Sequence, residues 1–265
     1  IKILQLVIYL QANITIKMRL TFLLLITLSV NAAVAQNRFE DAKYIYWQKG
    51  TKLQYTDFKN KAGEPLLSTS ENLKYRVQIP AILEYAETGE NLQDMKYYIA
   101  PAFDREFSVF VNHNEFDLEQ AQLYFDISEY WARITRERIS ELLKRDIYGG
   151  FNLEAFYVSD LKIKYPDTKK QFFEEKIAQK DKAAFTEVFR DIIEVMYMER
   201  EKMAMELYFE MNFENKEAVV ANWRKKADDL LKFTDEFATS QAECLRFINA
   251  RPANGYQVVF EDKGR

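Results

Sequence analysis

Residues 114–145 constrain the fold of this chain more than any other stretch. They contain neither proline nor glycine. At about 100° per residue, their apolar positions fall into separate strips on a helix. The first strip contains Phe116, Gln120, Tyr124, Ile127, Trp131, Ile134 and Leu142, and the second contains Phe125, Ala132, Ile139 and Leu143. A helix that is apolar on two sides packs against two layers, so we expect it at the centre of a domain. We expect the Ile127 side to face strands from the N-terminal half.

Two polar residues, Gln120 and Tyr124, interrupt the first strip one helical turn apart. In the H-E-x-x-H motif of zinc peptidases, the same spacing places two histidines on one side of a helix, with a glutamate as general base. Ala121 stands at the position of that glutamate. Glutamine is a weak neutral ligand, tyrosine must ionise from a pKa of about 10, and alanine accepts no proton. We therefore expect Gln120 to form a hydrogen bond with Tyr124 or the backbone, and no metal site.

The residues around these positions resemble the LLxHEQxHFDIxExxAR helix of a bacterial family of secreted, predicted zinc-dependent proteases, domain of unknown function 922. The matches on this helix are Leu118, Glu119, Gln122, Phe125, Asp126, Ile127, Glu129, Ala132 and Arg133. Trp47, Leu53, Asp57 and Phe58 match the opening signature of the family, and Trp223 matches its closing Q-x-x-W helix. The resemblance covers residues 44–145 well and 205–231 weakly. It implies a degenerate member in which Gln120, Ala121 and Tyr124 are vestigial active-site positions and the matching residues are structural.

The supply of zinc ligands is small. His113 and Cys244 are the only histidine and cysteine, and protein zinc sites are built mainly from these residue types. The resemblance implies zinc in the family, but we expect no cofactor, no metal ligand and no catalytic residue in this chain. We expect His113, just before the helix, to be a cap or surface residue. A single cysteine also excludes an intramolecular disulfide.

The N-terminal region has the layout of a secretory signal peptide. Lys17 and Arg19 flank Met18, an apolar run covers residues 20–30, and residues 33–35 form an A-x-A cleavage site. We expect residues 1–17 to be an upstream extension and residues 18–35 a signal peptide, with an uncleaved anchor as the alternative. The run is short for a membrane span. We therefore expect a periplasmic or secreted protein with no stable membrane span after cleavage.

The net charge restricts the class of partner. It is −4 for the whole chain, and it becomes −7 without residues 1–35, which contain three basic and no acidic residues. Nucleic acid and anionic lipid both require a basic face. We expect neither of these as a partner, but an envelope protein or peptide. The basic cluster at residues 224–226 is interpreted as the solvated side of a helix.

The remaining patterns indicate an α+β fold. Short β elements are expected at residues 44–58, 73–79, 95–100 and 106–111, with Pro80 at a strand end. A long helix running to about residue 210, with a break near 179–182, precedes a helix capped by Asn215 and a closing strand at 255–260. We expect a small, mainly antiparallel N-terminal sheet on the central helix, then a largely helical C-terminal half. Residues 36–265 would form one metallopeptidase-like domain, with a β-rich part at 36–146 and a helical part at 147–265.

These observations predict an exported pseudoenzyme that acts by binding in the cell envelope. Two alternatives stay open, a hydrolase with an unrecognised site and a structural interaction protein of the envelope. An exposed apolar patch would favour the interaction protein. A deep cleft with convergent carboxylates on the Gln120 face would favour the enzyme.

Overall fold

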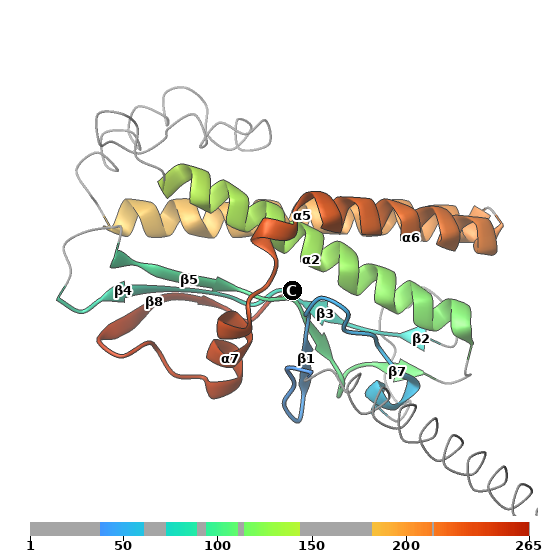
Figure 1. Cartoon of the computed structure of the whole chain (residues 1–265), viewed down its shortest axis with the longest axis horizontal. Coiled ribbons are helices and arrows are strands. Elements are labelled where there is room, and N and C mark those ends of the chain that lie inside the picture. Colours follow the sequence, from blue (N-terminus) through green and yellow to red (C-terminus); the bar gives the residue numbers. More distant parts are fainter. Residues whose placement is uncertain are drawn as a thin grey trace, which may run out of the picture. The chain divides into compact units, whose positions relative to one another are not determined.

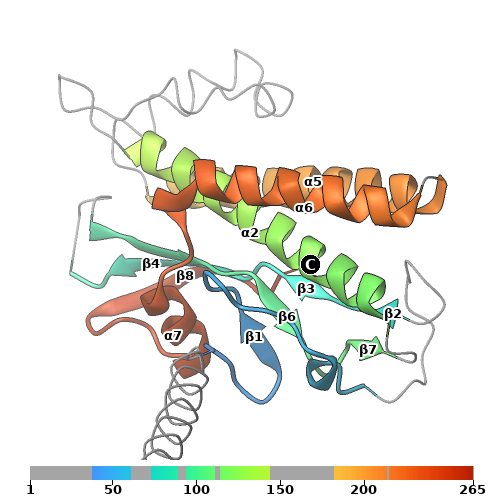
Figure 2. The same ribbon diagram turned by 45° about the vertical axis from the view of Figure 1, so that its right-hand side comes forward.

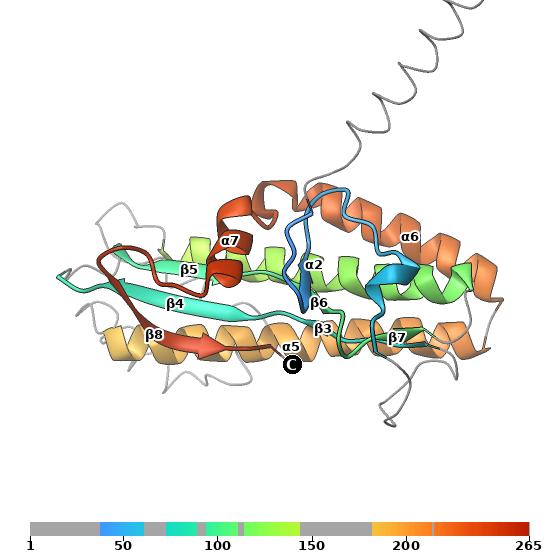
Figure 3. The ribbon, with the colours of Figure 1, turned by 90° about the horizontal axis from the view of Figure 1, so that it is seen from below.

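The computed structural model describes residues 38–60, 73–88, 94–110, 114–143, 182–213 and 215–264. Three long helices lie on one face of a layer of short strands, and a shorter helix lies on the other face (Figures 1 and 3). The long helices are α2 (Glu115–Leu143), α5 (Lys182–Phe213) and α6 (Lys216–Phe233), and the shorter one is α7 (Gln241–Asn249). The predicted α+β class is therefore confirmed.

Every strand pair in the described part of the chain is antiparallel. The strands form three small sheets, with the orders β1-β6-β3, β2-β7 and β5-β4-β8. Their bounds are β1 Tyr44–Tyr46, β2 Leu73–Lys74, β3 Val77–Gln78, β4 Ala81–Ala86, β5 Lys96–Ile99, β6 Ala102–Asp104, β7 Val109–Phe110 and β8 Tyr256–Asp262. The predicted closing strand is thus confirmed, and by pairing with β4 it brings the C-terminal region into the N-terminal half.

Two strand predictions need correction. The expected strand at 73–79 is divided, since β2 pairs with β7 whereas β3 pairs with β6. Between them, the backbone N–H of Arg76 donates to Ser108 Oγ at 3.1 Å instead of to a strand. Strand β4 was not predicted, because it is buried along most of its length and therefore lacks alternation of apolar and polar residues. Its Glu84 is fully buried and paired with Arg246 of α7 at 2.6 Å.

Helix α2 contacts the strands and both other long helices, as its two apolar strips predict (Figure 2). Helix α5 also packs directly on the strands. Ala121 and Phe125 pack in a cluster with Phe103 of β6. Ile127 packs instead with Leu207 of α5 and with α6. The expectation that the Ile127 side faces the strands is therefore wrong. Both layers offer large apolar groups, and burial of apolar area is not directional.

The ends of the last two helices follow local capping rules. The side chain of Asn215 accepts hydrogen bonds from the first turn of α6, which confirms the predicted cap. Helix α7 begins with a reciprocal capping box between Ser240 and Glu243. This helix was not predicted, although S-x-x-E is a recognisable signal.

Residues from Arg38 onward form one compact unit. Several predictions fall on residues outside the described ranges. They are the boundaries at residues 17 and 35, the surface or cap position of His113, and the first part of the long helix before residue 182. These, and the assignment of residues 36–265 to one domain, stay predictions. No helix within the described ranges has the length and apolar character needed to cross a membrane.

Candidate functional site

The three vestigial positions are built into the interior. Ala121 is fully buried, and Gln120 is 3% exposed. Tyr124 packs with its ring centre 5.4 Å from that of Tyr75, and its hydroxyl donates to Glu201 Oε1 of α5 at 2.9 Å. The structure thus gives Tyr124 the partner Glu201 in place of Gln120, and the alternative backbone partner of Gln120 stays a prediction. Burial raises the pKa of Tyr124 above its usual range, so the phenol stays protonated and donates.

These residues do not fit a zinc ion. Glu201 is the carboxylate near Tyr124, and it is already held by the Tyr124 hydroxyl and by Arg200 Nη2 at 2.5 Å. Ala121 supplies no ligand and no base. Within the described ranges, no group of three or more histidine, cysteine, aspartate or glutamate side chains could hold a metal ion.

The family-matching residues converge on a different side of α2. Asp126 Oδ1 accepts hydrogen bonds from Trp47 Nε1 at 2.8 Å and from Gln122 Nε2 at 3.1 Å. Gln122 Oε1 in turn accepts from the backbone N–H of Leu53 at 2.8 Å. Residues 47–53, the segment that follows β1, are thereby attached to α2 by buried polar contacts. Trp47 and Asp126 are 79 positions apart, so no local pattern could have predicted this pair.

Arg224 joins α6 to the same edge of α2. Its Nη1 contacts Asp126 Oδ2 at 2.6 Å, and its Nε contacts Glu119 Oε1 at 2.6 Å. The side chain of Arg224 is 21% exposed. The interpretation of residues 224–226 as a solvated face therefore needs correction for Arg224, whereas Lys225 and Lys226 are exposed. A basic residue on a helix surface becomes a structural tie when a carboxylate from another helix lies within reach.

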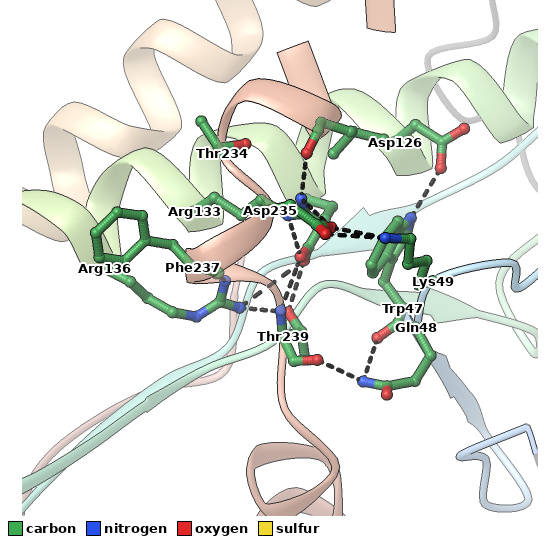
Figure 4. A network of polar contacts seen from close by, with 12 residues as sticks. Trp47, Gln48, Lys49, Asp126, Arg133, Arg136, Thr234, Asp235, Phe237 and Thr239 are labelled. Carbon is green, nitrogen blue, oxygen red and sulfur yellow. Dashed lines mark hydrogen bonds and ion pairs between the residues drawn. The ribbon is translucent and has the colours of Figure 1, made fainter. Parts of the chain in front are cut away.

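Glu129 and Arg133 form a buried ion pair on this face. Figure 4 shows the surrounding network, with Arg133, Arg136 and Thr239 labelled. Arg133 Nε donates to Glu129 Oε1 at 2.8 Å, and both side chains are at most 1% exposed. Glu129 also accepts hydrogen bonds from the backbone N–H of Thr239 at 2.9 Å and from its hydroxyl at 2.6 Å. The Arg133 guanidinium lies 4.9 Å from the centre of the Trp47 ring. The i,i+4 spacing is that of an ordinary helix-stabilising pair, but burial and additional partners make this pair part of the core.

Arg136 continues this network by one turn. Its Nε donates to Glu243 Oε1 at 3.0 Å, and its Nη2 donates to the carbonyl of Ile99 at 2.6 Å and also bonds the Thr239 hydroxyl. Together with Arg133, which donates to the carbonyl of Leu231 at 2.5 Å, it holds the connection from α6 to α7. Two buried arginines thus face two buried glutamates, which compensates the cost of removing charges from water.

The other family-matching residues have structural surroundings. Asp57, in the 3-10 helix η1 (Tyr55–Asp57), is 1% exposed and accepts hydrogen bonds from Gln54 N and Arg38 Nη2, both at 2.7 Å. Phe58 contacts the ring of Phe103 edge-on at 5.1 Å. Leu53 is buried in the same cluster, and Trp223 is buried between α5 and α6. These positions are consistent with structural roles.

A cleft of about 450 Å³ lies beside this network. Its walls are the segment after β1, helix α2, the last turns of α6 and the 3-10 helix η4 (Asp235–Phe237). Trp47 and Leu231 are apolar lining residues, and the charged lining consists of Lys49, Lys52, Arg133, Arg224, Lys232, Asp126, Asp228 and Asp235. A second hollow, of about 530 Å³, lies between β8 and the first turns of α5.

The described residues that line the cleft include one hydroxyl side chain, Thr51, beside lysines and aspartates. No serine or histidine is among its lining residues. The single thiol, Cys244, is fully buried outside it, and burial raises its pKa to about 12. A protonated, buried thiol is unreactive. The lining offers mainly charged groups, since Trp47 is only 4% exposed.

Comparison with known proteins found no matching family model, no similar curated protein and no similar solved structure.

Proposed function

We propose that this protein is exported to the cell envelope and acts there as a non-catalytic binding protein, a degenerate relative of the zinc-dependent protease family that it resembles. Its ligand would be an envelope protein or peptide, and the binding site would be the cleft beside Trp47 and Arg133. The observation that carries this proposal is the contrast between full burial of Ala121 and an open cleft on another side of the same helix.

Two further observations support a binding function. The positions where a peptidase would hold its metal and base are filled by core packing and by the contact between Tyr124 and Glu201. The cleft at Trp47 has a volume within the range of about 300–1,000 Å³ that ligand pockets occupy. Arg133, Arg224 and Asp126 of its lining are also held in place by ion pairs, which favours preorganised binding.

Elemental analysis tests the absence of a zinc-dependent reaction. The purified protein is incubated with zinc, dialysed exhaustively and analysed together with a zinc peptidase treated in the same way. We expect far less than about one zinc per chain, because a structural or catalytic site needs three or four ligands. We also expect no cleavage of a fluorescent casein substrate. A stoichiometric zinc content or zinc-dependent cleavage would contradict the proposal.

Fractionation of cells that express the complete chain tests export. We expect the protein in the periplasm or medium, with Gln36 as its first residue, because the A-x-A site ends at Ala35. An uncleaved product that stays with the cytoplasmic fraction would contradict this part of the proposal.

A second candidate, the structural interaction protein, is favoured by an apolar strip on α5. Met198, Met205 and Phe209 are 69%, 49% and 49% exposed, and their spacing places them on one side of the helix. Exposed apolar strips of this kind mark protein contacts. Chemical cross-linking in cells separates the two candidates. If the strip on α5 is the contact surface, Met198→Glu with Met205→Glu should remove the cross-links to a partner, whereas binding in the cleft would leave them unchanged.

A further inference from the structure

The cleft carries more positive than negative charge in a chain that is acidic overall. Five cationic and three acidic side chains line it, whereas the whole chain has a net charge of −4. A local excess of positive charge concentrates anionic ligands at that place. We propose that the cleft binds an acidic peptide segment, whose carboxylates contact its lysines. This inference rests on the proposed binding function and names the class of ligand.

Each acidic residue of the cleft has a cationic neighbour, and Arg224 is shared by Asp126, Asp228 and Glu119 outside the lining. Asp126 is paired with Arg224 at 2.6 Å, and Asp228 lies 3.5 Å from the same guanidinium. Asp235 is paired with Lys49 at 2.9 Å, and this contact lowers its pKa. A carboxylate that is already paired gains little from a second cation. A basic ligand would therefore have to compete with Arg224 and Lys49 for these carboxylates.

Two lysines supply the excess positive charge. Lys52 follows β1, and Lys232 lies in the last turn of α6, so the two ammonium groups come from different walls of the cleft. Both residues are exposed, and within the described part of the chain neither has an ion pair. A pair of ligand carboxylates would gain Coulomb energy without displacing an existing partner.

The apolar lining and the size of the cleft narrow the ligand further. Trp47 and Leu231 offer apolar contact between the charged groups. A volume of about 450 Å³ accommodates a few residues of an extended chain, but no folded domain or nucleic-acid duplex. A short segment in which acidic and apolar side chains alternate matches both features, since alternate side chains of an extended chain point in opposite directions.

Isothermal titration calorimetry with the full chain tests this assignment. The probes are a blocked tetrapeptide of alternating glutamate and leucine, the same peptide with lysine in place of glutamate, and inorganic phosphate. We expect binding of the glutamate peptide only. Its affinity should fall when the salt concentration rises from about 0.05 M to about 0.5 M, because exposed charges are screened.

A matched pair of double variants locates the site. Lys52→Glu with Lys232→Glu should weaken binding of the glutamate peptide at least about tenfold. Lys202→Glu with Lys225→Glu changes the net charge equally, at exposed positions of α5 and α6 outside the cleft. This control should retain the affinity within about a factor of two, because rim charges far from the site act weakly.

The other outcomes overturn the assignment in distinguishable ways. Equal loss in both double variants would mean attraction to the whole surface. Tighter binding of the lysine peptide would contradict an acidic ligand, although the protein would still be a binding protein. Phosphate binding of equal strength would indicate a site for inorganic anions, and binding of none of the probes would remove the acidic peptide as ligand. The proposed function itself would be contradicted only by a stoichiometric zinc content, by zinc-dependent cleavage of casein or by a cytoplasmic, uncleaved product.

Discussion

Two sides of helix α2 differ in what they do with polar residues. On the side of the vestigial positions, Ala121 packs in an apolar cluster and Tyr124 contacts an exposed glutamate of α5. On the other side, Asp126 and Arg133 line an open cleft and are held by partners from distant segments. Apolar side chains fill the space beside Ala121. Beside Asp126 and Arg133, paired charged side chains line a cleft.

The difference shows that one helix can be packed by apolar contacts on one side and by paired charges on another. Apolar packing at Ala121 requires only shape and volume. The network at Asp126 and Glu129 requires partners at defined distances, because a buried charge without a partner costs several kcal/mol, about 3–5 when one member of a pair is removed. Asp126 and Glu129 are among the residues that resemble the zinc-protease helix. Gln120, Ala121 and Tyr124, at the positions of the H-E-x-x-H motif, do not resemble it.

The largest expected effect comes from Ala121→Glu, the central change needed to restore a peptidase motif. We expect a loss of about 3–5 kcal/mol in the free energy of unfolding, since the carboxyl would enter an apolar cluster without a partner. Urea denaturation measures this loss, with Ala221→Glu on the exposed side of α6 as the control. A loss below about 1 kcal/mol would show that position 121 faces an open site, and the contrast between the two sides would fail.

Glu129→Gln tests the paired-charge side with a change of almost no volume. It should lower the free energy of unfolding by about 3 kcal/mol, because Arg133 and Arg136 would lose a buried counter-charge. Glu236→Gln, at an exposed position of η4, is the matched control. If the two variants unfold at the same urea concentration, the network does not stabilise the fold.

Asp126→Ala removes the acceptor shared by Trp47, Gln122 and Arg224. We expect a loss of about 2 kcal/mol, the range for hydrogen bonds to a charged group. The Asp228→Ala control removes a carboxylate that is 63% exposed, and should change stability by less than about 0.5 kcal/mol. Trp47 fluorescence should also shift in Asp126→Ala alone, and an unchanged spectrum would contradict the indole contact.

Tyr124→Phe should have the smallest effect, about 1 kcal/mol for one hydrogen bond. Its pH dependence has a defined sign, because burial raises the folded pKa of Tyr124. The contribution of the hydroxyl is fully present below the unfolded pKa of about 10 and is lost as the pH rises above it. Wild type should therefore lose stability more steeply than Tyr124→Phe between about pH 10 and pH 11. Equal slopes for wild type and Tyr124→Phe would contradict the burial of Tyr124.

The sequence by itself determined the local structure of this protein. The spacing of apolar residues in 114–145 was enough to predict α2 and its packing from two sides, because helical periodicity is a property of the backbone. Asn215 identified the start of α6, and the run GYQVVF at residues 255–260 identified β8. Ser240 and Glu243 carried the equivalent signal for α7.

Only the tertiary structure decided which partners each side of α2 has. Apolar burial does not distinguish one layer from another, so Ile127 could be assigned to the strands when it packs on α5 and α6. The contacts from Asp126 to Trp47 and Arg224 join residues 79 and 98 positions apart. Such contacts depend on where the chain returns after several turns, and the pattern around either residue does not contain that information. For the same reason the sequence could list the residues beside the cleft but could not predict that they form one.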